Sequence, residues 1–335
     1  MPGPRSSASK RASGSERSLS SRSEAASGRR EVRRLGFVGL GNLGRHLAGS
    51  LLRGGFTLTV NDLDETAAAP LVEAGAVWAP SPADVAAVSE TVFTCLPSPE
   101  IVTDVLCGAS GLLAGFGHSG TWIDSSTNDR HELARLAALA QAQGIGCLEA
   151  PVTGGVHLAA SGRITVLVGG DAELVESNIP AFRAIGEKVF YVGPLGSASA
   201  IKVITNMLAF THLVAAGEAL MLAKRSGLDL AQSFEVIKAS SGTSFVHETE
   251  SQVILNGSYD IGFTIDLALK DLGLALDLGD ELGVPLELAS LVEKAFARAR
   301  EEYGGAAWSP MVVKLLEDAL GTDLRAPGFP ERLEA

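Results

Sequence analysis

The feature that most constrains the fold is an alternation of strand-like and helix-like segments that stops after Gly193. Between residues 34 and 193, apolar runs such as RLGFVG, FTLTVND and RITVLVGG alternate with stretches of helical periodicity. This alternation predicts an α/β fold with a parallel, doubly wound sheet. The later residues indicate helices alone, at 197–226, 229–240, 264–282, 286–303 and 309–319. We therefore predict a nucleotide-binding domain over 34–195, followed by an all-helical domain over 196–325.

The first 34 residues differ from the rest of the chain in composition and charge. They carry nine Lys and Arg against three Glu, a net charge of +6, whereas the whole chain carries −12 and the remainder therefore −18. They are rich in Ser, Arg and Gly and cannot bury enough apolar surface to offset ordering, so we predict a disordered tail over 1–33. A transit peptide would also be basic and Ser-rich, but this stretch has no amphipathic apolar face.

Composition excludes several classes of protein. The acidic body repels phosphates, which disfavours a specific nucleic-acid partner. No run of eighteen apolar residues is present, so we expect no membrane-spanning helix. Three cysteines without paired spacing and six histidines without a ligand cluster predict a reducing, cytoplasmic location and no metal site. These cysteines are Cys95, Cys107 and Cys147.

A glycine motif follows the first apolar run. Gly39, Gly41 and Gly44 form GxGxxG after an expected strand and at the start of an expected helix. This context allows a pyrophosphate to approach the N-terminus of the helix, as in Rossmann-type domains. We predict that the loop binds the cofactor through Gly39, Leu40, Gly41, Asn42, Leu43 and Gly44.

Three later strand ends are expected to border the same crevice. Asp62 follows the expected strand 57–61, about 20 residues after the glycines, where a carboxylate binds a ribose 2′-hydroxyl and repels a 2′-phosphate. We therefore predict NAD as cofactor, with NADP less favoured. Leu96-Pro97 follows 92–95 and either ends that strand or contacts the cofactor. Residues 124–127 (DSST) follow 121–123 and are expected to contact ribose, to cap a helix over 128–143, or both.

Two further features carry polar groups suited to chemistry. Thr153, Gly154 and Gly155 follow an apolar run, and a hydroxyl beside two glycine N–H groups forms either a carboxylate-binding nest or a simple turn. In the stretch GPLGSASAIKVITNM, Lys202 lies in a helix that is apolar almost all round, with Asn206 one turn later. Lysine is rarely buried without compensation, so Lys202 either lies at the surface or serves the reaction.

The chain resembles the β-hydroxyacid dehydrogenases, most closely 3-hydroxyisobutyrate dehydrogenase-like enzymes. The resemblance spans residues 34–316 and rests on four motifs in order: GFVGLGNLG, EAPVTGG with SGRITVLVGG, GPLGSASAIKVITN, and DLALKDLGLALDL. It implies a Rossmann-type domain joined by a long helix to a helical domain through which the chain forms homodimers or homotetramers. It also implies that Lys202 is catalytic with Asn206, and that Thr153, Gly154 and Gly155 hold a small carboxylate-bearing substrate.

The resemblance further places Leu96, Pro97, Thr127 and Lys270 at the cofactor. For Lys270 the alternative is a solvated, salt-bridged helix face shared with Asp266, Asp271 and Asp277. The chain departs from the family at three positions. Thr153 stands where the family usually has serine before the two glycines, Ala198 where it has a glycine, and Thr205 where it often has an asparagine. The segment SSGTSF (240–245) lacks the Arg and Trp of some relatives, so their substrate does not carry over. His247, in an expected loop, could also touch substrate.

These features predict an NAD(P)-dependent 3-hydroxyacid dehydrogenase. Burial and the nearby helix N-terminus would lower the pKa of Lys202, so that it acts as general acid and base while Asn206 and Thr153 orient the substrate. An NADPH-dependent reductase of glyoxylate, succinic or tartronate semialdehyde is an alternative that Asp62 disfavours. An imine reductase or a catalytically inactive scaffold would generally lack the lysine.

Overall fold

The computed structural model describes residues 33–334, which form part of one compact unit. The expected tail over 1–33 therefore lies outside the described residues, apart from Arg33. The domain boundaries predicted at 34–195 and 196–325 stay predictions.

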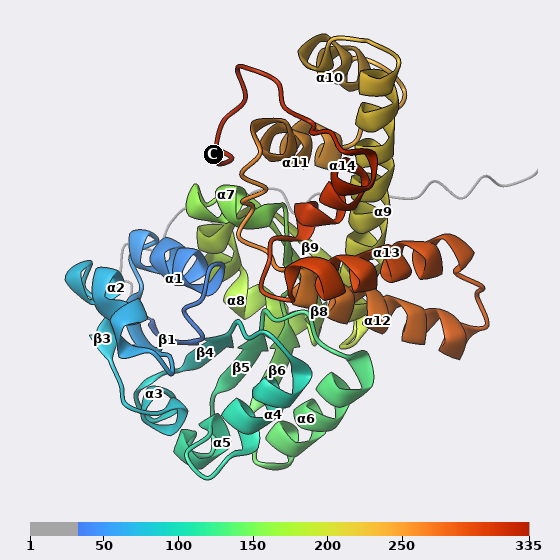
Figure 1. Cartoon of the computed structure of the whole chain (residues 1–335). Coiled ribbons are helices and arrows are strands. Elements are labelled where there is room, and N and C mark those ends of the chain that lie inside the picture. The colour runs from blue at the N-terminus through green and yellow to red at the C-terminus, as the bar shows by residue number, and fades with distance from the viewer. Residues whose placement is uncertain (1–32, 335) are drawn as a thin grey trace, which may run out of the picture. The chain divides into compact units, whose positions relative to one another are not determined.

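A nine-stranded sheet forms the first half of this unit (Figure 1). Its order is β3-β2-β1-β4-β5-β6-β8-β7, with β9 also paired to β8. The strands are β1 (Arg34–Val38), β2 (Thr57–Asn61), β3 (Val77–Trp78), β4 (Thr91–Thr94), β5 (Thr121–Asp124), β6 (Gly146–Glu149), β7 (Val152–Thr153), β8 (Ile164–Gly170) and β9 (Gly186–Gly193). The order β3-β2-β1-β4-β5-β6 is that of a Rossmann-type domain.

The predicted doubly wound, parallel sheet is confirmed from β3 to β6, and beyond β6 the sheet is mixed. β1 to β6 pair in parallel, but β8 runs antiparallel to both β6 and β7, and β9 then pairs with β8 in parallel. Parallel neighbours need a crossover, usually a full helix, whereas β7 turns back into β8 through only the short α7 (Gly155–Ala160). The turn reverses the strand direction and places Thr153 and the glycines at the edge of the sheet.

Helices cover both faces of the sheet (Figure 1). One face packs on α1 and α8 around Phe37, Leu47 and Phe182, and the other on α3 to α6 around Val102 and Leu133. The bounds are α1 (Gly44–Arg53), η1 (Glu65–Ala68), α2 (Ala69–Glu73), α3 (Pro82–Val88), α4 (Pro99–Cys107), α5 (Leu112–Gly115), α6 (Arg130–Ala142) and α8 (Ala172–Ile185). The carboxyl ends of β1, β2, β4 and β5 are therefore left for a ligand.

The second half consists of helices around their own core, which includes Phe210, Leu213 and Phe296. The elements are α9 (Ser197–Arg225), α10 (Leu230–Lys238), α11 (Phe245–Asn256), α12 (Ile265–Leu282), α13 (Glu287–Tyr303), η2 (Ser309–Val312) and α14 (Lys314–Leu320). Sequence reasoning missed α11, and it joined η2 and α14 into one helix over 309–319. His247 lies in α11 with 1% of its surface exposed, and its ring contacts the Phe234 carbonyl oxygen at 3.0 Å. The loop placement of His247 is therefore wrong.

α9 is long and apolar enough to cross a membrane, the one such helix among residues 33–334. Core helices of soluble proteins pass the same test of length and composition, so this finding is weak support for a membrane span.

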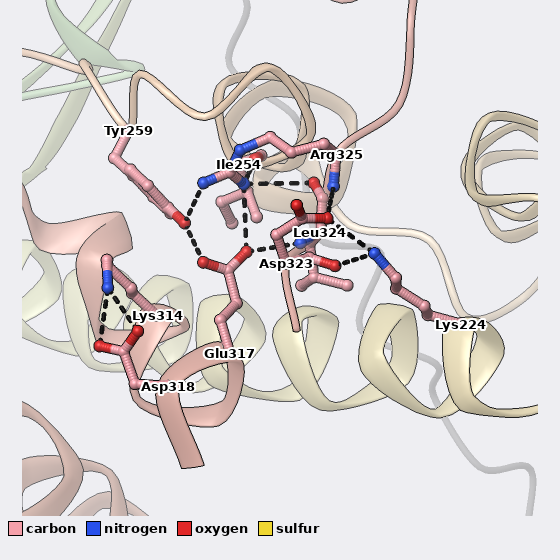
Figure 2. A network of polar contacts seen from close by, with 9 residues as sticks. All are labelled: Lys224, Ile254, Tyr259, Lys314, Glu317, Asp318, Asp323, Leu324 and Arg325. Carbon is pink, nitrogen blue, oxygen red and sulfur yellow. Dashed lines mark hydrogen bonds and ion pairs between the residues drawn. The ribbon is translucent and has the colours of Figure 1, made fainter. Parts of the chain in front are cut away.

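The chain after α14 folds back onto α11 through a polar network (Figure 2). Buried Glu317 accepts hydrogen bonds from the Leu324 N–H at 2.7 Å and from Arg325 Nη1 at 3.1 Å, and also from the Tyr259 hydroxyl. Arg325 Nη1 also donates to the carbonyl of Ile254 at 2.9 Å, near the C-terminus of α11. Because the last carbonyls of a helix lack partners within the helix, this contact stabilises the end of α11.

Candidate active site

The glycine loop between β1 and α1 has the geometry that a dinucleotide needs. Gly39 has φ +96°, and a Cβ there would lie 2.4 Å from the Cys95 carbonyl oxygen. A Cβ at Gly44 would lie 2.0 Å from the Gly39 oxygen, so side chains are excluded at both positions. A Cβ at Gly41 would meet no atom within 4 Å, so this position has open space beside it. The loop fits a pyrophosphate at the N-terminus of α1.

The other residues of the loop face the protein with their side chains. Leu40 is buried, Leu43 packs against the same core, and Asn42 Nδ2 donates to the Gly262 carbonyl at 3.1 Å. Leu40 and Leu43 therefore present mainly their backbone to a cofactor, whereas the side chain of Asn42 is exposed. Among residues 33–334, no cluster of three His, Cys, Asp or Glu could hold a metal ion.

Asp62 lies beside the glycine loop, at the end of β2. Its Oδ2 accepts a hydrogen bond from the Leu40 N–H at 2.6 Å, and its Oδ1 accepts one from the Asp64 N–H at 3.0 Å. A carboxylate so close to the loop is suited to a ribose diol.

The ends of β4 and β5 are joined by hydrogen bonds. The Leu96 N–H donates to Ser126 Oγ at 2.9 Å, and buried Asp124 accepts from Thr94 Oγ1 at 2.9 Å and from Asn128 Nδ2 at 3.0 Å. The expectation that 124–127 caps the next helix is wrong. α6 begins at Arg130, and its cap is Asp129, which accepts from the N–H groups of residues 131 and 132.

Lys270 reaches this edge of the sheet from α12. Its Nζ donates to the Thr127 carbonyl at 2.7 Å and lies 2.8 Å from Asp271 Oδ1. The alternative for Lys270 was a solvated, salt-bridged helix face that included Asp271. Asp271 is 1% exposed and does not belong to such a face. Asp266 does form an exposed ion pair, with Arg300. Lys270 thus links the helical half to a strand end predicted at the cofactor.

Lys202 is buried, with 8% of its surface exposed, so the interpretation as a surface lysine is wrong. Its Nζ donates to Asn206 Oδ1 at 2.9 Å, and Asn206 Nδ2 donates to Asp271 Oδ2 at 2.6 Å. A continuous polar chain therefore runs from Lys202 through Asn206 and Asp271 to Lys270. The pKa of Lys202 is lowered to about 8, chiefly by burial; the Asp271 carboxylate opposes this shift and the Lys270 charge adds to it. An amine of this pKa can both donate and accept a proton near neutral pH.

Glu149 fixes the start of α9, a role that sequence reasoning missed. Its Oε1 accepts from the Ala198 N–H at 2.8 Å, and its Oε2 accepts from the Ser199 N–H at 2.9 Å and from Ser199 Oγ at 2.5 Å. Burial raises the pKa of Glu149, while these hydrogen bonds favour the carboxylate. A carboxylate at a helix N-terminus is stabilising, and this one positions the helix that carries Lys202. The sequence signal for this role was a single glutamate, Glu149, at the end of the otherwise apolar run GIGCLE.

The predicted substrate nest lies in β7 and the turn after it. Gly154 has φ +123° and Gly155 φ +85°, conformations that favour glycine. Thr153 pairs with Thr165 of β8, and β8 also packs against α9. The nest and the helix of Lys202 therefore share one neighbouring strand. The hydroxyl of Thr205, which stands where relatives often have asparagine, donates to the Lys202 carbonyl at 2.8 Å.

A glycine loop with open space at Gly41 and a carboxylate at the next strand end are typical of a Rossmann-type dinucleotide-binding protein. Residues 34–193 match the family model for the NAD-binding domain of 6-phosphogluconate dehydrogenase. Residues 196–316 match the model for the NAD-binding of NADP-dependent 3-hydroxyisobutyrate dehydrogenase. The chain belongs to the β-hydroxyacid dehydrogenase family, as the sequence motifs predicted.

Individual relatives agree with this assignment. The chain is 33% identical to 2-(hydroxymethyl)glutarate dehydrogenase of Eubacterium barkeri, over 87% of this chain and 97% of the relative. It is 34% identical to the mitochondrial 3-hydroxyisobutyrate dehydrogenase of Mus musculus, over 78% of this chain and 80% of the relative. The structure of Mycobacterium tuberculosis 3-hydroxyisobutyrate dehydrogenase with L-serine matches with a TM-score of 0.76 and 29% identity, covering 85% of this chain and 99% of that one. The fold and the general activity, an NAD(P)-dependent hydroxyacid dehydrogenase, follow from these matches.

Proposed function

We propose that the chain transfers hydride between NAD and the alcohol of a small 3-hydroxy acid similar to 3-hydroxyisobutyrate, with Lys202 as general acid and base. The observation that carries the proposal is the buried Lys202 amine, with a pKa of about 8 and a hydrogen bond to Asn206. In the oxidation direction the neutral amine takes the proton of the substrate hydroxyl; in the reduction direction the ammonium returns it to the carbonyl oxygen. When bound, the nicotinamide ring accepts or supplies the hydride.

The remaining site residues bind and orient. Asn206 and Thr153 orient the substrate hydroxyl, and the N–H groups of Gly154 and Gly155 receive the substrate carboxylate. The loop 39–44 holds the pyrophosphate, with further cofactor contacts from Leu96, Pro97, Thr127 and Lys270.

NAD is the proposed cofactor because Asp62 lies at the glycine loop, where its charge repels a 2′-phosphate. The description of the second family model as NADP-dependent favours one alternative, an NADPH-dependent semialdehyde reductase. Replacing Asp62 separates the two cofactor assignments. If Asp62 selects NAD, its replacement shifts the preference towards NADP.

We also propose that the chain forms homo-oligomers through its helical half and acts in the cytoplasm, without a nucleic-acid or membrane partner. Large apolar side chains at the junction of α12 and α13 support the assembly, because each is at least 49% exposed. They are Leu282, Val284, Leu288 and Leu291.

The test is Lys202→Ala, assayed by NADH absorbance with a panel of 3-hydroxy acids. Loss of the general base should lower kcat by about 10²- to 10⁴-fold. NADH binding, measured by fluorescence, should stay within about threefold, because Lys202 acts on the substrate proton. Lys294→Ala, an exposed lysine on α13, is the matched control. Turnover retained in Lys202→Ala would refute the assignment.

A further inference from the structure

The loop between α11 and α12, residues 257–264, reaches from the helical half to the glycine loop and to α7. The Gly262 carbonyl accepts a hydrogen bond from Asn42 Nδ2 at 3.1 Å. A Cβ built at Gly262 would lie 3.2 Å from Val156 Cγ2, so the backbone packs closely against α7. Asn42 belongs to the GxGxxG motif, and Val156 directly follows Gly155 of the nest. The 257–264 loop therefore contacts both of the elements that are proposed to bind the cofactor and the substrate.

The backbone at the start of this loop has a conformation that L-residues rarely adopt. Tyr259 has φ +54°, the one positive φ of a non-glycine residue among residues 33–334. The left-handed region is costly for a residue with a bulky side chain, and such residues cluster at functional sites. Tyr259 is 4% exposed, and its hydroxyl donates to Glu317 and accepts from Arg325 Nη2 at 2.9 Å (Figure 2). The helical half thus anchors the loop through Tyr259.

Asp260 fixes the turn that ends at Gly262. Its Oδ1 accepts a hydrogen bond from the Gly262 N–H at 3.2 Å, which forms an Asx turn. Its Oδ2 lies 2.8 Å from Nε of Arg332, whose side chain is 80% exposed. An exposed ion pair contributes little, whereas the turn orients Gly262, the residue whose carbonyl meets Asn42. Asp260 therefore acts on Asn42 through the backbone of Gly262.

We propose that Asp260 is a positioning residue for the cofactor: through Gly262 it holds Asn42 and so restrains the glycine loop in the shape that receives the pyrophosphate. This inference rests on the proposed function, because it takes the loop 39–44 as the pyrophosphate site. Gly41 has open space beside it and the Asn42 side chain is exposed, so the hydrogen bond to Gly262 restrains a part of the loop that the core does not enclose. A loop that is ordered before binding loses less conformational entropy when the ligand binds, and the affinity is therefore higher.

A double-mutant cycle on NADH affinity tests the proposal, with Kd measured by NADH fluorescence. Asp260→Ala removes the acceptor of the turn and should raise Kd by about 3- to 10-fold, the usual effect of one hydrogen bond. Asp260→Asn keeps an amide oxygen that can accept from the Gly262 N–H, so Kd should stay within about twofold. In the Asn42→Ala background, Asp260→Ala should have no further effect, because Asp260 acts through Asn42. Arg332→Ala breaks only the exposed ion pair and is the control, with Kd unchanged.

A second perturbation of the same contact keeps Asp260 intact. Gly262→Ala introduces a Cβ at φ +69° and 3.2 Å from Val156, so the loop must shift and the Gly262 carbonyl should leave Asn42. Its Kd should rise as in Asp260→Ala, and again only where Asn42 is present. Thermal unfolding checks that each variant folds.

The results distinguish a failure of the positioning role from a failure of the cofactor assignment. An unchanged Kd in Asp260→Ala, the same loss in Arg332→Ala, or an equal further loss in the Asn42→Ala background would overturn the role of Asp260 alone. The pyrophosphate is common to NADH and NADPH, so the cycle should give the same fold-changes with NADPH, and tighter binding of NADPH would overturn only the choice of NAD. Absence of NADH and NADPH binding in the unmodified chain would overturn both proposals.

Discussion

Replacing Asp271 by asparagine tests whether the polar chain from Lys202 to Lys270 sets the protonation of the Lys202 amine, the proposed general acid and base. Asn206 separates the two groups, through hydrogen bonds of 2.9 Å to Lys202 and 2.6 Å to Asp271. With the amide between them, the charges lie about 8 Å apart, which at an effective dielectric constant of about 20 corresponds to about 2 kcal/mol. That energy equals about 1.5 pH units. The Asp271 carboxylate stabilises the ammonium, so its removal lowers the pKa of Lys202 below about 8.

The assay is the pH dependence of kcat/KM in both directions. Oxidation needs the neutral amine, so its activity rises with pH through the pKa of Lys202; in Asp271→Asn this limb should move to lower pH by about 1 to 1.5 units. Reduction needs the ammonium, so its falling limb should move to lower pH by the same amount. Asp277→Asn, on an exposed residue of the same helix, is the control and should leave both limbs unchanged. A limb that stays in place or moves to higher pH in Asp271→Asn would refute the reasoning.

Three further substitutions test other parts of the structure. Asp62→Ser removes the charge beside the glycine loop and should raise the ratio of NADP to NAD kcat/KM by about 10- to 100-fold; an unchanged ratio would count against Asp62 as the selecting group. Glu149→Gln weakens the hydrogen bonds to the start of α9 and should lower kcat about tenfold while NADH binding is kept. An unchanged kcat would show that the position of Lys202 does not depend on Glu149. Arg325→Met leaves buried Glu317 without its cation and should lower the unfolding free energy by about 3 kcal/mol. This loss is near the low end of the cost of breaking a buried ion pair, because the guanidinium is partly exposed. Chemical denaturation measures this loss, and a value under about 1 kcal/mol would show that the network in Figure 2 contributes little.

The parts of the site that could be predicted are those in which local chemistry determines the backbone. Gly39 and Gly44 are required by close backbone approaches, and such requirements are visible as a spaced motif. The strand 57–61 was predicted with its observed bounds because an apolar run there ends at a polar pair. By contrast, α11 has a run of polar residues in its middle (247–252), and its one local signal was Ser244, whose side chain accepts from the His247 N–H.

The positions that could not be predicted depend on contacts between distant segments. Lys270 and Asp271 are adjacent in sequence, and both were compatible with an exposed, amphipathic helix face. In the structure Lys270 reaches Thr127, 143 residues away, while Asp271 is buried against Asn206, 65 residues away. Asp271 meets Asn206 because α12 packs against α9, and no local pattern encodes that packing. The same turn of α12 contacts the predicted cofactor edge and reaches the Lys202 amine through Asn206. Substitutions at Lys270 and Asp271 should therefore affect cofactor affinity and proton transfer together, with a non-additive double mutant.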